Sequence, residues 1–217
     1  MNPIEIKICG ITRVEDALAA IELGAAMLGL NFYPQSPRSI TLERARQIAQ
    51  AAAGRVKLVG VFVNMNVSDV VGIARGVPLD AVQLHGDEPG GDCQILAAEF
   101  EVIRTLKVDA EFGEVSAAQF AACRALLLDA PSAGYGGAGK SFNWATVDWK
   151  RLRGAFPSAR LWLAGGLHAA NVRQAIAIAH PDLVDVCSGV ESAKGIKSVQ
   201  KMREFVAAVR AAERQEQ

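Results

Sequence analysis

Ile4-Glu5-Ile6-Lys7-Ile8-Cys9-Gly10 is a short, mostly apolar run of the kind that forms a buried strand, and it is closed by a glycine. The next stretch, Arg13–Leu23, has apolar residues at helical spacing. Thr12, with Glu15 three residues later, predicts a capping box at the start of that helix. One strand followed by one helix is therefore the unit from which we interpret the rest of the chain.

The same unit recurs along all 217 residues. The predicted strands are Ile4–Cys9, Met27–Phe32, Lys57–Val63, Ala81–Leu84, Val102–Leu106, Ala125–Asp129, Arg160–Ala164 and Leu183–Cys187. The predicted helices are Arg13–Leu23, Leu42–Ala52, Val67–Arg75, Gly90–Glu99, Phe112–Ala122, Trp144–Arg153, Ala170–Ala179 and Val199–Ala212. Because the strands are nearly continuous apolar runs, they are typical of parallel strands that are buried on both faces.

Strict alternation of strands and helices leaves two main topologies. An open, doubly wound sheet usually has fewer strands, and no GxGxxG motif follows the first strand. A closed barrel uses every unit, and neither a linker nor a shift in composition divides the chain. We therefore predict an α/β fold, the (β/α)8 TIM barrel, as one domain over residues 1–217.

The composition excludes several classes of function. A hydrophobic content of 51% with eight prolines indicates a globular protein rather than a disordered one. The net charge is zero, so no overall field attracts nucleic acid or an anionic membrane. The chain has no basic leader and no apolar run as long as a membrane span, so we expect a cytoplasmic protein.

The cysteines and histidines stand far apart in the sequence, which predicts neither a disulfide framework nor a zinc site. They are Cys9, Cys93, Cys123, Cys187, His85, His168 and His180. We expect no metal and no cofactor, and a small molecule as the partner. Because no interface signature stands out, we also expect a monomer.

Unusual residues gather where strands lead into helices, which in a TIM barrel is the C-terminal mouth. Gly165-Gly166 follows the seventh strand and Ser188-Gly189 follows the eighth. Glycines at such positions let backbone N–H groups approach an anion. Gly136-Gly137, in the glycine-rich loop after the sixth strand, joins them. These loops predict a phosphate site, and tight turns without a ligand are the alternative.

Cys9 and Asp129 end the first and sixth strands, so they can face each other across the mouth. A thiolate base opposite a carboxylic acid suits proton transfer without a cofactor. Lys7 lies two residues before Cys9 on the same strand face, and we expect its ammonium to lower the thiol pKa from about 8.5 toward neutrality. The alternatives are a buried structural thiol for Cys9 and a helix cap or loop anchor for Asp129.

Two further residues at the mouth carry hypotheses. Arg38 follows the second strand, and a guanidinium binds a carboxylate through two hydrogen bonds, so we predict that Arg38 holds a substrate carboxylate. A solvated charge ahead of the next helix is the alternative. His85 follows the fourth strand and is either a substrate contact or a satisfied loop histidine; the loop histidine is the interpretation we favour.

Taken in order, these motifs resemble the phosphoribosylanthranilate isomerase family over essentially the whole chain. The motifs are Lys-Ile-Cys-Gly (7–10), Ser-Pro-Arg (36–38), Val-Gly-Val-Phe-Val-Asn (59–64), Val-Gln-Leu-His-Gly (82–86), Leu-Leu-Asp (127–129), Leu-Ala-Gly-Gly-Leu (163–167) and Ser-Gly-Val-Glu (188–191). Each is common alone, and seven in order are specific. The resemblance implies a cofactor-independent isomerase of tryptophan biosynthesis that converts N-(5-phosphoribosyl)anthranilate to its 1-deoxyribulose 5-phosphate isomer.

The resemblance also implies roles for single residues. Asp129 matches the general acid that opens the ribose ring, and Cys9 matches the base that removes the C2 proton. Arg38 matches the arginine that holds the anthranilate carboxylate. The rival interpretations are another phosphosugar barrel, such as an epimerase or indole-glycerol-phosphate synthase, and a barrel that binds phosphate without catalysis.

Four positions depart from the family pattern. They are Ala138 in place of Thr in Gly-Gly-Thr-Gly, Asn143 in place of Asp in Phe-Asp-Trp, Cys187 in place of Ser in Ser-Ser-Gly, and Ser198 in place of Asp in Gly-x-Lys-Asp. Asn143 and Ser198 still offer side chains that cap the following helices. Ala138 and Cys187 each remove a hydroxyl near the predicted phosphate site.

Overall fold

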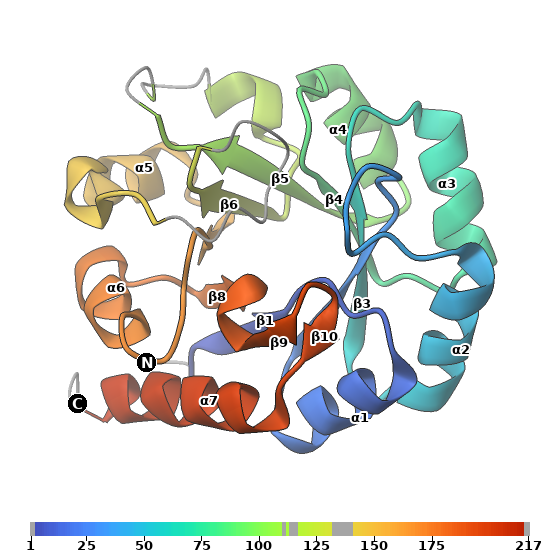
Figure 1. The fold of residues 1–217 in the computed structure, drawn as a ribbon. Coiled ribbons are helices and arrows are strands. Elements are labelled where there is room, and N and C mark those ends of the chain that lie inside the picture. Colours follow the sequence, from blue (N-terminus) through green and yellow to red (C-terminus); the bar gives the residue numbers. More distant parts are fainter. Residues whose placement is uncertain (1–2, 110–111, 113–116, 132–140, 215–217) are drawn as a thin grey trace.

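The structure, a computed structural model, describes residues 3–109, 112, 117–131 and 141–214. Its main sheet is a closed barrel in which each strand pairs with the next and β8 pairs with β1, all in parallel (Figure 1). The barrel strands are β1 (Glu5–Ile8), β2 (Met27–Asn31), β3 (Lys57–Phe62), β4 (Ala81–Leu84), β5 (Glu101–Lys107), β6 (Ala125–Asp129), β7 (Arg160–Leu163) and β8 (Leu183–Val186). The predicted TIM barrel is confirmed.

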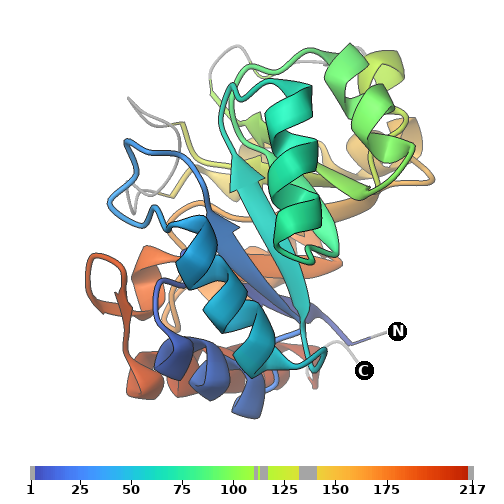
Figure 2. The ribbon, with the colours of Figure 1, turned by 90° about the vertical axis from the view of Figure 1, so that its right-hand side faces the viewer.

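Helices surround the barrel, as the two views in Figures 1 and 2 show. The α-helices are α1 (Val14–Glu22), α2 (Leu42–Ala52), α3 (Val67–Gly76), α4 (Gly90–Ala97), α5 (Trp149–Ala155), α6 (Val172–Ala179) and α7 (Val199–Glu213). The 3₁₀ helices are η1 (Ala117–Phe120), η2 (Trp144–Thr146) and η3 (Ser188–Val190). No helix among the described residues is long and apolar enough to cross a membrane.

Strand side chains point alternately into the barrel and outward against the helices. The inward set forms its own apolar cluster, which includes Met27, Val59, Leu127 and Trp162. The outward set packs with the helices in a larger cluster. Both faces of each strand are therefore buried, which explains the nearly continuous apolar runs in the sequence. Lys7 pairs in register with Met27, so a charged side chain occupies an inward position.

Predicted strands and most predicted helices agree with the structure to within two residues at either end. Two predicted helices are wrong. The stretch Trp144–Arg153 is split into η2 and α5, because the Asp148 side chain accepts a hydrogen bond from the Arg151 N–H at 2.9 Å and caps a new helix. Asn143 caps η2 at 3.1 Å, as predicted for that side chain.

The second wrong helix is Phe112–Ala122, of which the described part contains only the four-residue η1. Its backbone lies close to the start of α4, where a Cβ on Gly90 would come within 2.8 Å of the Gln119 side chain. Phe120 supplies a buried apolar side chain at the end of η1. Over residues 117–122, a short 3₁₀ turn that packs against α4 therefore stands where the sequence predicted the end of an amphipathic helix, and residues 113–116 of that prediction lie outside the described residues.

The predicted capping box at Thr12 is also wrong. Arg13 is the N-cap of α1, without a side-chain hydrogen bond, and the Thr12 hydroxyl donates to the Gly195 carbonyl instead. Gly195 lies between β9 (Glu191–Ala193) and β10 (Ile196–Lys197), a small antiparallel hairpin that the sequence did not predict. This hairpin follows β8 and brings Glu191 and Lys197 to the mouth of the barrel (Figure 1).

Candidate active site

Cys9 lies immediately after β1, where the strand leaves the barrel. Its backbone N–H donates to the Val186 carbonyl of β8 at 2.9 Å, which fixes the end of β1 against β8. Gly29 on β2 leaves room for the thiol, because a Cβ there would lie 2.7 Å from the Cys9 Sγ. Gly10 has a φ of +70°, a left-handed backbone conformation that favours glycine, and it turns the chain sharply after the cysteine.

Below Cys9, an ion pair crosses from β1 to β8 inside the barrel. The Lys7 Nζ lies 2.9 Å from the Asp185 Oδ2, and the Lys7 side chain is 0% exposed. Burial opposes the charged form of Lys7, but Asp185 and the Cys9 thiolate outweigh it and raise the lysine pKa. Burial raises the pKa of Asp185 to about 7 in spite of Lys7. Lys7 is thus held as a cation directly beneath the thiol.

A second cysteine meets the first. The largest influence on the Cys9 pKa is a hydrogen bond from the Cys187 thiol, which favours the Cys9 thiolate. Burial acts against it, and the charges of Lys7 and Lys197 lower the pKa further, so the Cys9 pKa lies well below its ordinary value. The same hydrogen bond, together with burial, raises the pKa of Cys187. The pair therefore favours the thiolate form on Cys9 and the thiol form on Cys187.

Arg38 is engaged by a neighbouring carboxylate. Its Nε and Nη2 bind the two oxygens of Glu191, each at 2.7 Å, and both side chains are buried. Lys197 adds a second cation 2.9 Å from the Glu191 Oε1. Burial works to raise the pKa of Glu191, but Arg38 and Lys197 hold it below its usual value. Arg38 therefore presents only its Nη1–Nη2 edge to a ligand.

On the other side of the mouth, Asp129 ends β6. Its Oδ1 accepts a hydrogen bond from the Ala130 N–H at 2.8 Å, and its Oδ2 lies 3.3 Å from the His85 Nε2. The Asp129 side chain is 13% exposed, so the carboxyl is enclosed without being sealed from solvent. Gly165 approaches from the loop after β7, where a Cβ would lie 3.3 Å from the Asp129 Oδ1.

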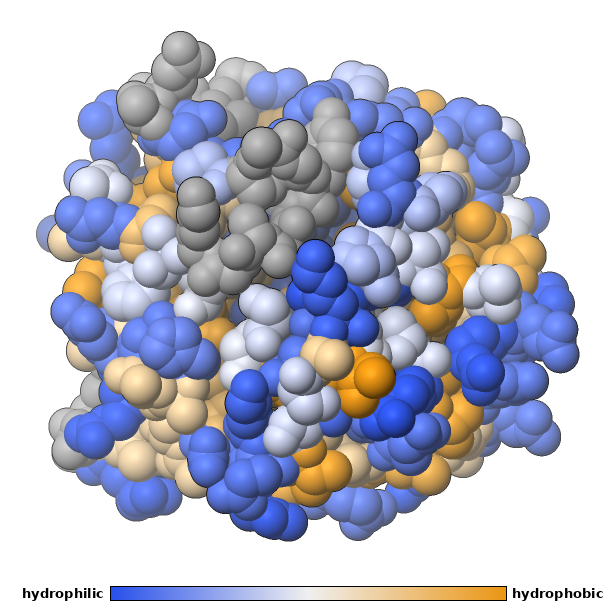
Figure 3. Space-filling model, viewed as in Figure 1, coloured by the Kyte–Doolittle hydropathy of each residue, from blue (hydrophilic) through white to orange (hydrophobic). Residues whose placement is uncertain are grey.

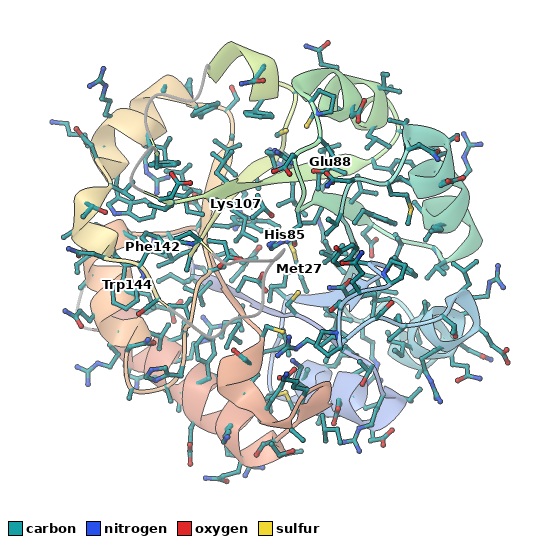
Figure 4. All side chains as sticks on the ribbon, turned by 45° about the horizontal axis from the view of Figure 1, so that its top comes forward. Met27, His85, Glu88, Lys107, Phe142 and Trp144 are labelled. Carbon is teal, nitrogen blue, oxygen red and sulfur yellow. The ribbon has the colours of Figure 1, made fainter. Side chains whose placement is uncertain are left out.

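His85 is positioned by two neutral side chains. Its Nδ1 lies 2.9 Å from the Gln83 Nε2 and 3.3 Å from the Thr105 hydroxyl. Because the Gln83 amide NH₂ is a donor, this arrangement makes Nδ1 the acceptor and puts the ring proton on Nε2, toward Asp129. In Figure 4, His85 lies near the middle of the ring of helices. Because it lies beside Asp129, His85 can orient that carboxyl, which is a role beyond the satisfied loop histidine that we favoured.

The loops after β7 and β8 lie against each other. A Cβ on Gly189 would collide with the Leu167 carbonyl oxygen, so glycine permits the close approach. Gly165 and Gly166 both have positive φ values, +85° and +59°. Within the described part of the chain, the backbone N–H groups of Gly165, Gly166, Ser188 and Gly189 have no hydrogen-bond acceptor. Four such donors at one side of the mouth suit an anion.

The predicted site residues Gly136 and Gly137 lie outside the described residues, as does Ala138. The structure therefore brings Cys9, Arg38, Ser188 and Gly189 together on the β1–β8 side. It brings Asp129 and Gly165-Gly166 together on the β6–β7 side. In the described ranges, no group of three or more His, Cys, Asp or Glu side chains is arranged to hold a metal ion.

Comparison with known proteins matches the chain to one family. The sequence model of N-(5'-phosphoribosyl)anthranilate (PRA) isomerase covers residues 6–208. The chain belongs to this family. The N-(5'-phosphoribosyl)anthranilate isomerase of Pseudomonas putida strain W619 is 44% identical to it, over 98% of this chain and 100% of its own length.

Two solved isomerases are similar in structure as well. One, with a TM-score of 0.84 and 37% identity, is a complex with reduced 1-(o-carboxyphenylamino)-1-deoxyribulose 5-phosphate. The other, from Thermotoga maritima, has a TM-score of 0.82 and 37% identity, and it is described as monomers generated from a dimeric enzyme. Each covers 96% of this chain and 99% of its own. These similarities extend over the whole barrel.

Sequence reasoning missed three groups that this family member places around Cys9 and Arg38. Asp185, Glu191 and Lys197 all come from the segment that begins with β8. One signal was present for Asp185: it is a single charge inside an otherwise apolar strand. Glu191 and Lys197 gave no such signal, because the hairpin that carries them was not predicted.

Proposed function

We propose that the protein catalyses the Amadori rearrangement of N-(5'-phosphoribosyl)anthranilate to 1-(2-carboxyphenylamino)-1-deoxyribulose 5-phosphate, a step of tryptophan biosynthesis. One observation carries the proposal: a thiol with a lowered pKa at the end of β1 and a carboxyl at the end of β6 border one barrel mouth. Strands β7 and β8 lie between them, and their loops carry the four N–H groups that have no acceptor among the described residues. Base, acid and anion site thus surround a single opening.

Asp129 is the general acid in this proposal. Its proton goes to the ribose ring oxygen, the bond from that oxygen to C1 breaks, and the anthranilate nitrogen forms a protonated Schiff base. His85, 3.3 Å from the carboxyl, and the Ala130 N–H, at 2.8 Å, fix the carboxyl in one orientation. Orientation matters because proton transfer needs hydrogen-bond distance to the ring oxygen.

Cys9 is the general base. Its thiolate takes the C2 proton of the Schiff base, and the electron pair of that C–H bond moves to form an enolamine, which then tautomerises to the ketone. At the end of this sequence Asp129 has lost one proton and Cys9 has gained one, and exchange with solvent restores both. Lys7 and Lys197 favour the thiolate form that begins the step.

Arg38 and the glycine loops hold the two anionic ends of the substrate. The Nη1–Nη2 edge of Arg38 binds the anthranilate carboxylate, while Glu191 keeps the other edge and fixes the guanidinium plane. The N–H groups of Gly165, Gly166, Ser188 and Gly189 receive the phosphate. Gly136 and Gly137 complete this phosphate site in the proposal.

Purified protein tests the proposal directly. We expect the fluorescence of N-(5'-phosphoribosyl)anthranilate to fall under catalysis, and proton NMR to show the ketose as the product. Binding of the phosphosugar without turnover would contradict the proposal and favour the non-catalytic barrel. Turnover of another phosphosugar with none of this one would favour a different phosphosugar enzyme.

We also propose that the protein is a cytoplasmic monomer that needs no metal, cofactor, nucleic acid or membrane. Its exposed large hydrophobic side chains lie on four separate elements; among the described residues they are Leu42, Ile95, Ile196 and Val199. On the face in Figure 3, hydrophobic residues are scattered among hydrophilic ones in the coloured regions. Light scattering tests the state: a mass near 23.0 kDa supports a monomer, and twice that mass contradicts it.

A further inference from the structure

Cys9 and Cys187 are placed side by side by the barrel itself. Ile8 of β1 pairs in register with Val186 of β8, and each cysteine is the next residue on its strand. Neighbouring strands lie about 4.8 Å apart, within the range of about 4.4–6.8 Å that disulfide-bonded Cα atoms span. The strand register therefore places the backbones of Cys9 and Cys187 side by side, within the span of a disulfide, although they are far apart in the sequence.

The side chains of the two cysteines also meet. The Cys187 thiol is the largest influence that lowers the Cys9 pKa, which places the two side chains within interaction range. A Cβ on Gly10 would lie 3.0 Å from the Cys187 Sγ, so Cys187 reaches over the turn that follows Cys9. Both cysteines are partly exposed at the mouth, which gives a small oxidant access. The two thiols therefore lie close together and are accessible to a small oxidant.

The surrounding charges give the two sulfurs different reactivity. Cys9 faces the ammonium groups of Lys7 and Lys197, so it is the nucleophile of the pair. Lys197 lies 3.7 Å from the Cys187 Sγ, and the Arg38 guanidinium also faces that sulfur. Once Cys9 no longer carries a negative charge, these two cations, which also pair with Glu191, favour the ionisation of Cys187.

We propose that Cys9 and Cys187 form a reversible oxidation site for hydroperoxides. The Cys9 thiolate attacks the peroxide, the O–O bond breaks, and Cys9 becomes a sulfenic acid while the peroxide leaves as an alcohol or water. The Cys187 sulfur then attacks the Cys9 Sγ, the S–O bond breaks, and the oxygen leaves as water. The two thiols supply the two electrons that reduce the peroxide, and the product is a Cys9–Cys187 disulfide.

Bond formation follows from the geometry, whereas its effect on turnover rests on the proposed role of Cys9 as the base. With the disulfide closed, no thiolate is left to take the C2 proton. The disulfide also protects Cys9 from irreversible oxidation to the sulfinic acid, because Cys187 consumes the sulfenic acid first. A thiol reductant reopens it.

The chain contains a matched control in a second pair of cysteines. Cys93 on α4 and Cys123 ahead of β6 also share a hydrogen bond, which lowers the pKa of Cys93 and raises that of Cys123. Both are buried, so dissolved peroxide does not reach them in the folded protein. This buried pair therefore shows whether proximity of two thiols is enough for oxidation when peroxide has no access to them.

Peroxide treatment followed by trypsin under non-reducing conditions tests the proposal, because the two cysteines of each pair fall in different peptides. Cys9 lies in Ile8–Arg13 and Cys187 in Gln174–Lys194. We expect these two peptides to be joined, two hydrogens lighter than their sum, and expect no link between Cys93 and Cys123. We expect activity to fall by about 10²-fold, as for loss of a general base, and to return with dithiothreitol.

Variants sharpen the test, each measured against its own untreated activity. Cys187→Ser should lose activity to peroxide without recovery in dithiothreitol, with Cys9 found as the sulfinic acid, while Cys93→Ser should behave like the unaltered protein. Absence of the Cys9–Cys187 link, or full recovery of Cys187→Ser, would overturn the proposal. A complete link with undiminished activity would instead overturn Cys9 as the base and leave the oxidation site standing.

Discussion

The two sides of the barrel mouth are built on different physical principles. The base side is held by permanent charges, and its members are Lys7, Cys9, Asp185, Cys187 and Lys197. The acid side is held by neutral hydrogen bonds around one carboxyl, and its members are Gln83, His85, Thr105 and Asp129. A base must be ionised before substrate arrives, and fixed cations achieve that. An acid must give up a proton and regain it. Hydrogen bonds from neutral groups permit both forms of the Asp129 carboxyl.

The largest effect should come from the acid side. Replacing Asp129 by Asn keeps the size and the hydrogen bond from Ala130 but removes the proton to be donated. We expect kcat to fall by about 10²-fold or more, the usual contribution of a general acid. Initial rates in the fluorescence assay measure it. Asp80→Asn, ahead of β4 at the opposite end of the barrel, is the matched control and should stay close to the unaltered rate.

On the base side, the charges should also decide stability. Lys7→Met leaves Asp185 buried without its partner, and breaking a buried pair in this way costs about 3–5 kcal/mol. Urea unfolding measures the loss, and Lys7→Met with Asp185→Leu should recover most of it. If the single variant were as stable as the double one, the ion pair would not be what holds this side together.

The same variant should show a stronger pH dependence of stability than the unaltered protein. The pKa of Asp185 is about 7 when folded, above its ordinary value of 3.8, and loss of Lys7 raises it further. Between these values the folded state binds more protons than the unfolded state, so the unfolding free energy of Lys7→Met falls as pH rises from about 4. Urea midpoints at pH 5 and pH 8 measure the trend. A midpoint that rises with pH would contradict it.

A smaller shift should appear in the reactivity of Cys9. The Cys187 thiol is the largest influence that lowers the Cys9 pKa, so Cys187→Ala should move the pH midpoint of Cys9 alkylation upward by about one unit, an ordinary size for a protein-induced shift. Lys7→Met should move it in the same direction by less. Iodoacetamide labelling followed by peptide mapping gives both midpoints, and unchanged values would remove these residues from the account.

The smallest effect belongs to the neutral network. Gln83→Leu removes one hydrogen bond to His85 and one to Thr105, but also a buried Gln83 Oε1 that has no partner among the described residues. We expect a net loss of stability of only about 1 kcal/mol. Urea unfolding of this variant beside Lys7→Met compares the two sides directly. Equal losses of unfolding free energy in the two variants would contradict the distinction between the charged base side and the neutral acid side.

The barrel could be predicted from the sequence because each strand and helix is marked by its own local pattern of apolar residues. Runs such as Ala125–Asp129 and Ala81–Leu84 are mostly apolar, with one polar residue each, and their boundaries match the structure. The predicted helix boundaries were wrong where a single side-chain hydrogen bond, rather than the periodic apolar pattern, decides where a helix begins. Asp148 starts a new helix inside Trp144–Arg153, and Thr12 turns away from the helix to bind the Gly195 carbonyl. Both depend on contacts that periodicity does not reveal.

The site was predicted in part for a related reason. Cys9, Arg38 and Asp129 stand at strand ends, and strand ends meet at the mouth of a barrel. The partners that set their chemistry are 153 residues away for Arg38 and Glu191, and 178 for Lys7 and Asp185. Such pairs follow from the closure of β8 on β1 and from the unpredicted hairpin. Cys187 was visible as a departure from the family pattern, but only the register places it beside Cys9.

The central claim is that Cys9, favoured as a thiolate by Cys187 and by the cations Lys7 and Lys197, is the base of the reaction. The kcat of Cys9→Ser, beside the matched Cys123→Ser, tests it most directly. We predict a loss of about 10²-fold or more for Cys9→Ser with the fold intact by near-UV circular dichroism. A kcat within a few-fold of the unaltered protein would contradict the claim.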